Sequence, residues 1–289
     1  MTTLVPTAPT AALVVLLSLA PPLSLVAQEA SSAADRLLAL VPLLASADSH
    51  ERDDVAYGTA ERLIIREQAV PPEGLRRVMA AWLAGLDDRI GEQGTDSVFR
   101  RSFSALCLSL VAAQDLRAPF LTQAEFDRLL DRTLAYAAAE RDLRGFDPVT
   151  GWMHSVAHTA DLLKFLGRNP KLAPAAQTRI VEAIAAKVEQ ADTVFVWGEA
   201  ERIAAALRSL VVRPDAQLDA LGRWIAAWPD RHAALWADGP RIDPDRFARV
   251  QNARQILAAL AVSLPAEAGT PEPVTRIRTA LVDALARMR

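Results

Sequence analysis

Residues 97–110 read SVFRRSFSALCLSL, and the spacing of their apolar side chains decides the fold class. Phe99, Phe103, Leu106 and Leu110 follow one another at intervals of four, three and four residues. Apolar residues at this spacing share one face of an α-helix, which is the face that packs on a core. The stretch therefore predicts a core-facing helix.

The same pattern continues through the chain, with Ile180, Ile184 and Val188 at i, i+4 and i+8. Glycine and proline lie mostly between the periodic segments, and no run has the β-branched alternation of a strand. Ala, Leu and Arg are abundant and favour helix. The sequence predicts an all-α protein whose helices cover about 33–45, 52–69, 73–90, 96–113, 122–141, 152–167, 174–190, 199–211, 214–228, 243–262 and 273–288.

Several predicted helix ends carry end signals. Thr122 and Glu125 have the spacing of a capping box, and Asp243-Pro244 combines an N-cap with a first-turn proline. Asn169-Pro170 ends a helix, because the residue before proline avoids the α conformation. Helices of about 12–20 residues with short links predict stacked antiparallel pairs, an α-solenoid of HEAT-like character. A closed α/α toroid is the alternative.

The first 27 residues contain no Asp, Glu, Lys or Arg. An apolar run, 11–20, is followed by two prolines, and residues 25–27 can end in a cleavage site, which predicts a secretory signal peptide over 1–27. An uncleaved anchor is disfavoured, because about 20 apolar residues are needed to span a bilayer. We therefore expect a periplasmic or secreted protein without a stable membrane span, in which residues 28–289 form a single all-helical domain.

Charge and cysteine content exclude some function classes. The net charge is −3 over 289 residues, and the charges are mixed along the chain. Without a basic block or an aromatic-interleaved basic patch, the sequence does not indicate nucleic-acid binding. Cys107, the one cysteine, lies in an apolar segment, so we expect it to be buried, and it cannot form an internal disulfide.

Residues 151–163 read GWMHSVAHTADLL and contain the densest polar pattern. On a helix, His154, His158 and Asp161 would point at about 0°, 40° and −20° around the axis and share one face. Two imidazoles at i, i+4 can bind a zinc-like divalent metal, with Asp161 as third ligand or as a partner of a ligand. The glutamate that follows the first histidine in zinc proteases is replaced by Ser155, so a hydrolytic base would come from elsewhere.

Two readings of the same residues need no metal. Asp161 can accept a hydrogen bond from His158 and fix its tautomer, which leaves the other ring nitrogen as a base. Alternatively, both histidines and Asp161 form a buried network that ties neighbouring helices together. The residues alone leave these alternatives open.

Two further polar sets can reach the same place. Asp142 and Arg144 precede Trp152, whose indole could stack on a sugar ring, and the loop between them has the Gly and Pro content of a functional loop. Glu199 and Arg202 open a later helix after a glycine, where Glu199 could supply a missing carboxylate. The ordinary alternative is solvated charge, dipole complementarity and a local ion pair.

Four segments occur in a characteristic order: 96–106, 140–145, 151–163 and 198–202. With them the chain resembles the bacterial family labelled domain of unknown function 2785, over roughly 50–262. The Trp-x-His-x-x-x-His-x-x-Asp element is the most specific part. The resemblance implies an all-helical domain and groups the polar sets as one signature, but it implies no reaction. Typical members lack an export signal, so the N-terminus departs from the family pattern.

Three functions are compatible with these observations. The first is a binding module with a groove for a polar small molecule, glycan or peptide. The second is a metal-dependent hydrolase that uses His154, His158 and an acidic residue. The third is a structural or interaction protein with a buried His–Asp clamp. The candidate groove residues are Asp142, Arg144, Trp152, His154, His158, Asp161, Glu199 and Arg202.

Overall fold

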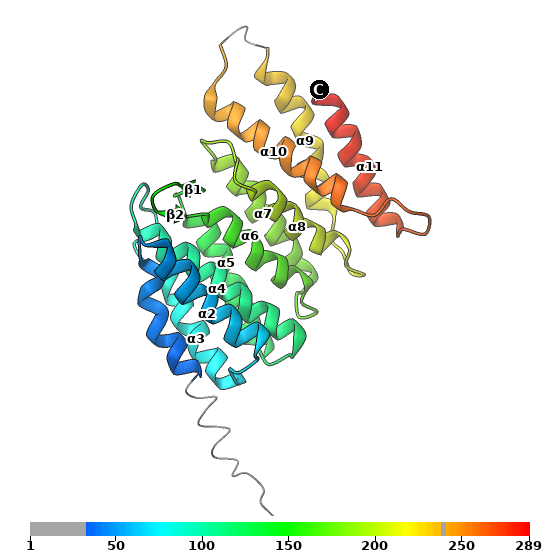
Figure 1. Cartoon of the computed structure of the whole chain (residues 1–289). Coiled ribbons are helices and arrows are strands. Elements are labelled where there is room, and N and C mark those ends of the chain that lie inside the picture. The colour runs from blue at the N-terminus through cyan, green and yellow to red at the C-terminus, as the bar shows by residue number, and fades with distance from the viewer. Residues whose placement is uncertain (1–32, 238–240) are drawn as a thin grey trace, which may run out of the picture.

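A computed structural model describes residues 33–237 and 241–289, which form an elongated stack of helices (Figure 1). The predicted signal peptide over 1–27 lies outside the described residues. The all-α class is confirmed, since the regular structure is helical apart from one sheet of two very short strands. The elements are a helix over 33–40, η1 (Val41–Ala45), η2 (His50–Tyr57), α2 (Gly58–Glu61), η3 (Arg62–Arg66), α3 (Pro72–Gly85), α4 (Ser97–Arg117), α5 (Gln123–Ala139), β1 (Phe146–Asp147), β2 (Gly151–Trp152), α6 (Ser155–Arg168), α7 (Pro174–Gln190), α8 (Glu199–Val211), α9 (Asp219–Leu235), α10 (Pro244–Ser263) and α11 (Glu272–Arg287).

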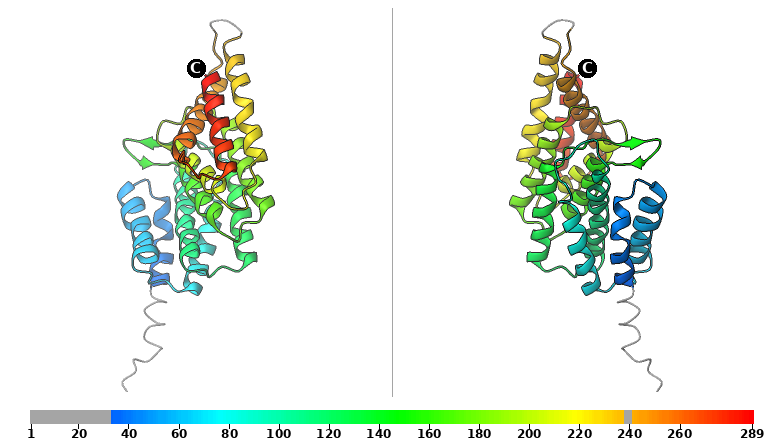
Figure 2. Two further views of the ribbon diagram at one scale, coloured as in Figure 1. Left: turned by 90° about the vertical axis from the view of Figure 1, so that its right-hand side faces the viewer. Right: turned by 90° about the vertical axis from the view of Figure 1, so that its left-hand side faces the viewer.

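From α4 onward, consecutive helices alternate between two layers. One layer is α4, α6, α8 and α10, which pack side by side in that order, and the other is α5, α7, α9 and α11. The first helices and α11 lie at opposite ends of the stack (Figures 1 and 2), so the alternative of a closed toroid is wrong. The alternation agrees with stacked helix pairs, while the HEAT-like character of the repeat stays a prediction.

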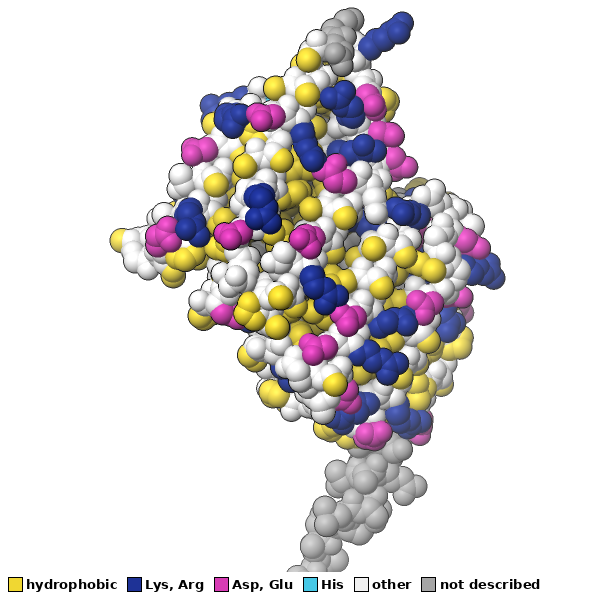
Figure 3. All heavy atoms as spheres, turned by 180° about the vertical axis from the view of Figure 1, so that it is seen from behind, with side chains coloured by type: hydrophobic (Ala, Val, Ile, Leu, Met, Phe, Trp, Pro, Cys, Tyr) yellow, Lys and Arg dark blue, Asp and Glu magenta, His cyan; other side chains and the backbone are white. Residues whose placement is uncertain are grey.

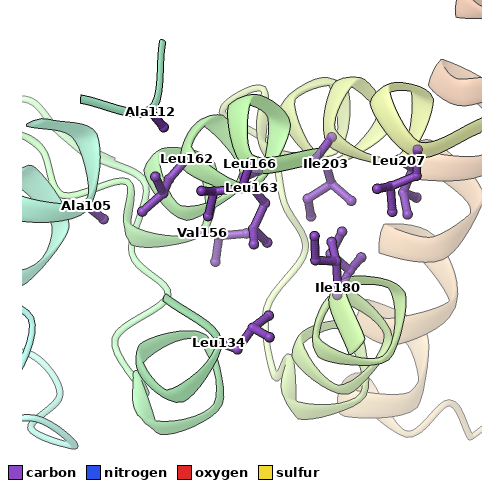
Figure 4. Close-up of a cluster of buried hydrophobic side chains, with 14 of the residues drawn as sticks. Ala105, Ala112, Leu134, Val156, Leu162, Leu163, Leu166, Ile180, Ile203 and Leu207 are labelled. Carbon is purple, nitrogen blue, oxygen red and sulfur yellow. The ribbon is translucent and has the colours of Figure 1, made fainter. Parts of the chain in front are cut away.

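The core lies between the two layers. In Figure 4, Val156 and Leu163 of α6 point toward Leu134 of α5 and Ile180 of α7, and all four side chains are buried. They belong to one cluster of buried apolar side chains that runs from Ala33 to Met288. Burial of such stripes is the main stabilising term of a helical stack. Cys107 is part of this cluster, as expected.

The predicted end signals are largely present. Thr122 and Glu125 form the capping box at the start of α5, and the Asp243 side chain accepts backbone hydrogen bonds at the start of α10. Asn169 ends α6 in an extended conformation. The helix predicted over 214–228 is found as α9, five residues later at its start. It continues past Pro229, a buried residue inside α9, although a proline removes one backbone hydrogen bond of the helix.

Two regions differ from the helix prediction near the polar segments. The helix predicted over 52–69 is a short α-helix between two π-helical segments, η2 and η3. The helix predicted from 152 starts at Ser155, because the residues before it belong to a β-hairpin that sequence periodicity did not indicate. The hairpin projects from one side of the stack (Figure 2).

Candidate functional site

The β1–β2 hairpin is built by three local features. Asp147 Oδ1 accepts hydrogen bonds from the backbone N–H groups of Val149 (2.8 Å) and Thr150 (2.9 Å), which closes the turn. Gly151 follows with a φ of 78°, and a Cβ there would come within 3.0 Å of Ser49 Cβ. Phe146 and Trp152 are then paired across the two strands. The hairpin thus presents two aromatic rings next to the start of α6.

Arg52 of η2 is hydrogen-bonded to the turn of this hairpin. Its guanidinium lies 4.1 Å from the centre of the Phe99 ring and 4.8 Å from that of Phe103, and its Nη2 donates to the Thr150 carbonyl at 2.8 Å. The side chain is fully buried, which is rare for arginine. Stacking and charge-assisted hydrogen bonds compensate the burial of this cation.

His154 sits at the junction of hairpin and helix with a φ of 52° and a ψ of 33°. This left-handed conformation is unfavourable for a residue with a Cβ. It is held because the N–H groups of Met153 and His154 donate to the carbonyls of Gly145 (2.9 Å) and Arg144 (3.0 Å). His154 is therefore the N-cap residue of α6 and not a member of the helix, which corrects the predicted one-face arrangement with His158.

The His154 ring is enclosed by Trp152 and Glu199. The indole of Trp152 stacks on it at 4.7 Å between ring centres with an angle of 22°. Nε2 lies 3.8 Å from Glu199 Oε1 and has no hydrogen-bond partner. Burial, followed by the nearby positive charge of Arg202, lowers the pKa of His154 to about 4. The imidazole is neutral at pH 7.

His158 is bound by Ser102 and not by Asp161. The Ser102 hydroxyl donates to the Met153 carbonyl, so it accepts from His158 Nδ1 at 2.8 Å. This arrangement leaves the lone pair on Nε2 of His158. Burial lowers its pKa well below the usual value, and the neighbouring His154 acts in the same direction. The predicted role of Asp161 in fixing the tautomer is wrong, since Ser102 has that role.

Asp161 forms ion pairs with two cationic side chains. Its Oδ1 accepts from Lys164 Nζ at 2.8 Å, and its Oδ2 is paired with the Arg202 guanidinium. Within residues 33–237 and 241–289, no group of three or more His, Cys, Asp or Glu residues is placed to hold a metal ion. The arrangement of His154, His158 and Asp161 thus does not fit the ligand set that their spacing suggested, because Asp161 points to Arg202.

Glu199 is the first residue of α8 and follows Gly198, whose φ of 89° turns the chain into the helix. Its Oε2 accepts from the Trp197 backbone N–H at 2.8 Å, and its side chain is 2% exposed. Burial raises the pKa of this carboxyl. No lysine or arginine forms an ion pair with it in the part of the chain that the structure describes.

A pocket with a volume of about 390 Å³ opens beside Glu199, and we call it the Glu199 pocket. Asp142 and Arg144 form an ion pair on its wall (2.6 Å), and Asp142 also accepts from the Gly94 N–H at 2.9 Å. Trp197 contributes a side chain that is 45% exposed. The lining residues are Gln93, Gly94, Arg141, Asp142, Leu143, Arg144, Gly145, Phe146, Asp192, Thr193, Val194, Val196, Trp197 and Glu199.

Gly145 makes the close approach at the base of this pocket possible. A Cβ at this position would lie 2.2 Å from Trp197 Cδ1 and 2.8 Å from Glu199 Oε1. Neither distance is compatible with a side chain, so only glycine allows the backbone to pass here. Residue 145 also accepts the hydrogen bond that holds Met153. It therefore joins the pocket wall to the segment that carries His154.

The structure brings together part of the predicted set. Asp142, Arg144 and Glu199 line the pocket, and His154 and Trp152 lie behind Glu199. His158 is hydrogen-bonded to Ser102 and does not line the pocket, and Asp161 and Arg202 form an ion pair with each other. The predicted convergence of the segments is thus found as contacts, although the pocket itself is lined by only three of the eight predicted residues.

Sequence reasoning missed Trp197, whose signal was its position directly before Gly198 and Glu199. It also did not indicate that Arg101 and Ser102 are both fully buried. Arg101 binds Glu140 through Nε at 2.6 Å and Nη2 at 3.0 Å. Arg101 and Glu140 are 39 positions apart, so no local sequence pattern predicts that they form a buried ion pair.

The surface outside the pocket has mixed character. On the face opposite that of Figure 1, acidic and basic side chains are interspersed (Figure 3). None of the helices in the described ranges is long and apolar enough to cross a membrane. The fold and the pocket define the class: an all-helical protein with a polar pocket lined by the segments before α4, after α5 and before α8.

The family follows from sequence comparison. A family model described as "Protein of unknown function (DUF2785)" matches residues 86–262, more than half of the chain, so the chain belongs to this family. The match covers the four segments that carried the resemblance and all the residues that line the Glu199 pocket. No curated protein matches the chain, and no solved structure matches it either.

Proposed function

We propose that this protein is a binding module that holds a polar small molecule in the Glu199 pocket. The observation that carries the proposal is Glu199 itself, a buried carboxylate that lines an open pocket without a cationic partner. Buried polar groups without compensation are rare in stable proteins and concentrate at functional sites.

The shape and lining of the pocket support binding. Its volume falls in the range of roughly 300–1,000 Å³ that is typical of small-molecule sites. Acidic, basic and amide side chains converge on it together with the half-exposed ring of Trp197. An aromatic ring can cover the apolar face of a sugar or an amino-acid side chain, while carboxylates and guanidinium groups bind the hydroxyl, amide or charged groups.

The walls of the pocket are held by side chains that have other fixed partners. Asp142 is bound by Arg144 and by the Gly94 N–H, and Arg52 and Ser102 fasten the hairpin segment from behind. A site supported in this way loses little order on binding, which favours affinity. In this proposal His158 and the Asp161–Arg202 pair stabilise the segment and do not touch the ligand.

Two-dimensional ¹H–¹⁵N NMR of the full chain tests the proposal. A panel of mono- and oligosaccharides, amino acids and short peptides is added at millimolar concentration. We expect at least one compound to shift the backbone signals of Gly94 and Gly145 and the indole signal of Trp197. If no compound in the panel shifts these signals, the proposed function is wrong.

Two half-exposed tryptophans provide a matched pair of variants. Trp197→Ala removes the ring that lines the pocket, whereas Trp236→Ala removes a ring with 49% exposure at the end of α9, outside the lining. Stacking of a ligand on an aromatic ring makes a substantial contribution to binding. We expect binding of the compound found in the panel to weaken about tenfold in Trp197→Ala and to stay unchanged in Trp236→Ala.

A further inference from the structure

The buried acids of this protein fall into two groups. Five carboxylates are buried in the described residues: Asp115, Glu140, Asp142, Asp161 and Glu199. The first four each form an ion pair with a lysine or arginine, at 3.0 Å (Lys171), 2.6 Å (Arg101), 2.6 Å (Arg144) and 2.8 Å (Lys164). Only Glu199 has no such cation within the described ranges. Its nearest basic group is the neutral imidazole of His154.

Glu199 has one oxygen that remains available. Oε2 is occupied by the Trp197 backbone N–H, while Oε1 faces His154 Nε2 at 3.8 Å, beyond hydrogen-bond distance. Nε2 is itself without a partner, and the His154 side chain is only 8% exposed. The His154 ring nitrogen that faces Glu199 therefore lacks the hydrogen-bond partner that burial normally requires, and no cationic side chain among the described residues reaches Glu199 to compensate its charge.

The charge and the aromatic content of the pocket point to the missing group. Three acids, Asp142, Asp192 and Glu199, line it against two bases, Arg141 and Arg144. Arg144 is already bound to Asp142. The ring of Trp197 lies next to Glu199, and aromatic faces attract cations. The position beside Glu199 thus favours a positively charged group.

We propose that the ligand of the Glu199 pocket carries a primary ammonium group, which supplies the cationic partner that Glu199 lacks. This inference rests on the proposed binding function. An ammonium group carries a positive charge and three N–H donors, so it can form a charge-assisted hydrogen bond with Glu199 and still donate to other oxygens of the pocket wall, whereas a hydroxyl group is neutral and has one donor. The remainder of the ligand extends past Trp197 toward Asp142 and Arg144.

Two matched pairs of probes test the ammonium group and its source. The first pair is glucosamine and glucose, and the second is Nα-acetyl-lysine amide and Nα,Nε-diacetyl-lysine amide. The first compound of each pair carries an ammonium group, and the second is a neutral analogue. The dissociation constants of both compounds at pH 7 are measured from the same NMR signals. We expect the ammonium member to bind about tenfold more tightly in at least one pair. The pair that responds identifies an amino sugar or a lysine-type ligand.

Two glutamates on the first turn of α8 provide the variants. Glu199→Gln keeps the size of the side chain and the acceptor for the Trp197 N–H but removes the charge. We expect it to reduce the preference for the ammonium compound over its neutral analogue to less than about twofold. Glu201→Gln removes an exposed carboxylate that does not line the pocket, and the preference should persist. A preference that survives in Glu199→Gln would overturn the assignment to this residue.

The remaining outcomes separate this inference from the proposed function. Equal binding of the charged and neutral members would overturn the ammonium group and leave the binding function intact. The same holds if no member of either pair binds while a compound of the wider panel shifts the pocket signals. If nothing shifts these signals, both proposals are wrong.

Discussion

Glu140 and Glu199 are both buried, but only Glu140 has a cationic side chain as a partner among the described residues. Glu140 receives two hydrogen bonds from Arg101 and further ones from the N–H groups of Arg141 and Asp142. Glu199 accepts from the Trp197 N–H, receives no hydrogen bond from a lysine or arginine among the described residues, and faces a neutral histidine. A buried charge that the protein compensates itself acts as a structural link, whereas an uncompensated one beside a pocket is available to a ligand. The variants below test this difference.

The largest effect is expected when Arg101 is replaced. Arg101→Met leaves Glu140 buried without its cation and should lower the free energy of unfolding by about 3–5 kcal/mol. Urea denaturation monitored by circular dichroism measures the change. Arg100→Met is the control, because Arg100 is partly exposed and no ion pair of it is found in the described residues. A loss of stability below about 1 kcal/mol in Arg101→Met would show that this pair is not a structural link.

Ser102 is expected to give the second largest effect. Ser102→Ala removes the hydroxyl that joins His158 Nδ1 to the Met153 carbonyl, and it should destabilise the protein by about 1–3 kcal/mol. Ser104→Ala is a matched control two residues away, because the Ser104 hydroxyl is equally buried but has no hydrogen-bond partner. Similar urea midpoints for the two variants would contradict the role given to Ser102.

The two histidines predict a pH dependence of stability. The pKa of His154 falls from the ordinary 6.5 to about 4 in the folded protein, and that of His158 is lowered as well. The unfolded chain therefore binds more protons below pH 6.5, and this contribution to stability is present above that pH and is lost as the pH falls toward 4. For His154 alone the loss between pH 7 and pH 5.5 is about 1 kcal/mol.

Urea denaturation at several pH values between 7 and 5.5 measures this slope. His154→Gln should flatten it. Glu199→Gln should make it steeper, because burial raises the pKa of Glu199 and its protonation stabilises the folded state as the pH falls. A wild-type stability that does not change over this range would show that the histidines are not buried in neutral form.

Glu199→Gln should have the smallest effect on stability at pH 7. The amide can still accept from the Trp197 N–H, and a buried charge without a cation is removed. We expect the free energy of unfolding to stay within about 0.5 kcal/mol of the wild type or to rise. Glu140→Gln, which loses its ion pair with Arg101, serves as the contrasting variant and should destabilise. Equal destabilisation of both would mean that Glu199 is compensated like Glu140.

The helices were predictable because their signals are local. The helices predicted over 174–190 and 199–211 have the observed bounds of α7 and α8. At both starts, the beginning of the apolar period coincides with a proline or follows a glycine. The Thr122–Glu125 capping box needs only four residues. In each case neighbours within one or two turns determine the outcome, so the pattern can be read from the sequence.

The hairpin and the pairings of the polar residues were not predictable in this way. The left-handed His154 depends on the carbonyls of residues 144 and 145, and His158 depends on Ser102, which is 56 positions away. The i, i+4 spacing of the two histidines predicted that they share one helix face. Periodicity alone does not show that the helix begins between them, at Ser155. The convergence of Glu199 on His154 was inferred from family order, and its geometry required the fold.

The buried Arg52 has a consequence for the boundaries of the stable unit. It lies outside the segment 86–262 that the family model matches, yet its hydrogen bond to Thr150 and its contacts with Phe99 and Phe103 reach into that segment. A fragment cut at the family boundaries would expose both aromatic rings to water and leave the turn of the hairpin without its anchor. The shortest fragment that keeps the pocket intact must therefore begin before Arg52, and recombinant fragments should start upstream of this residue and not at the boundary of the family match.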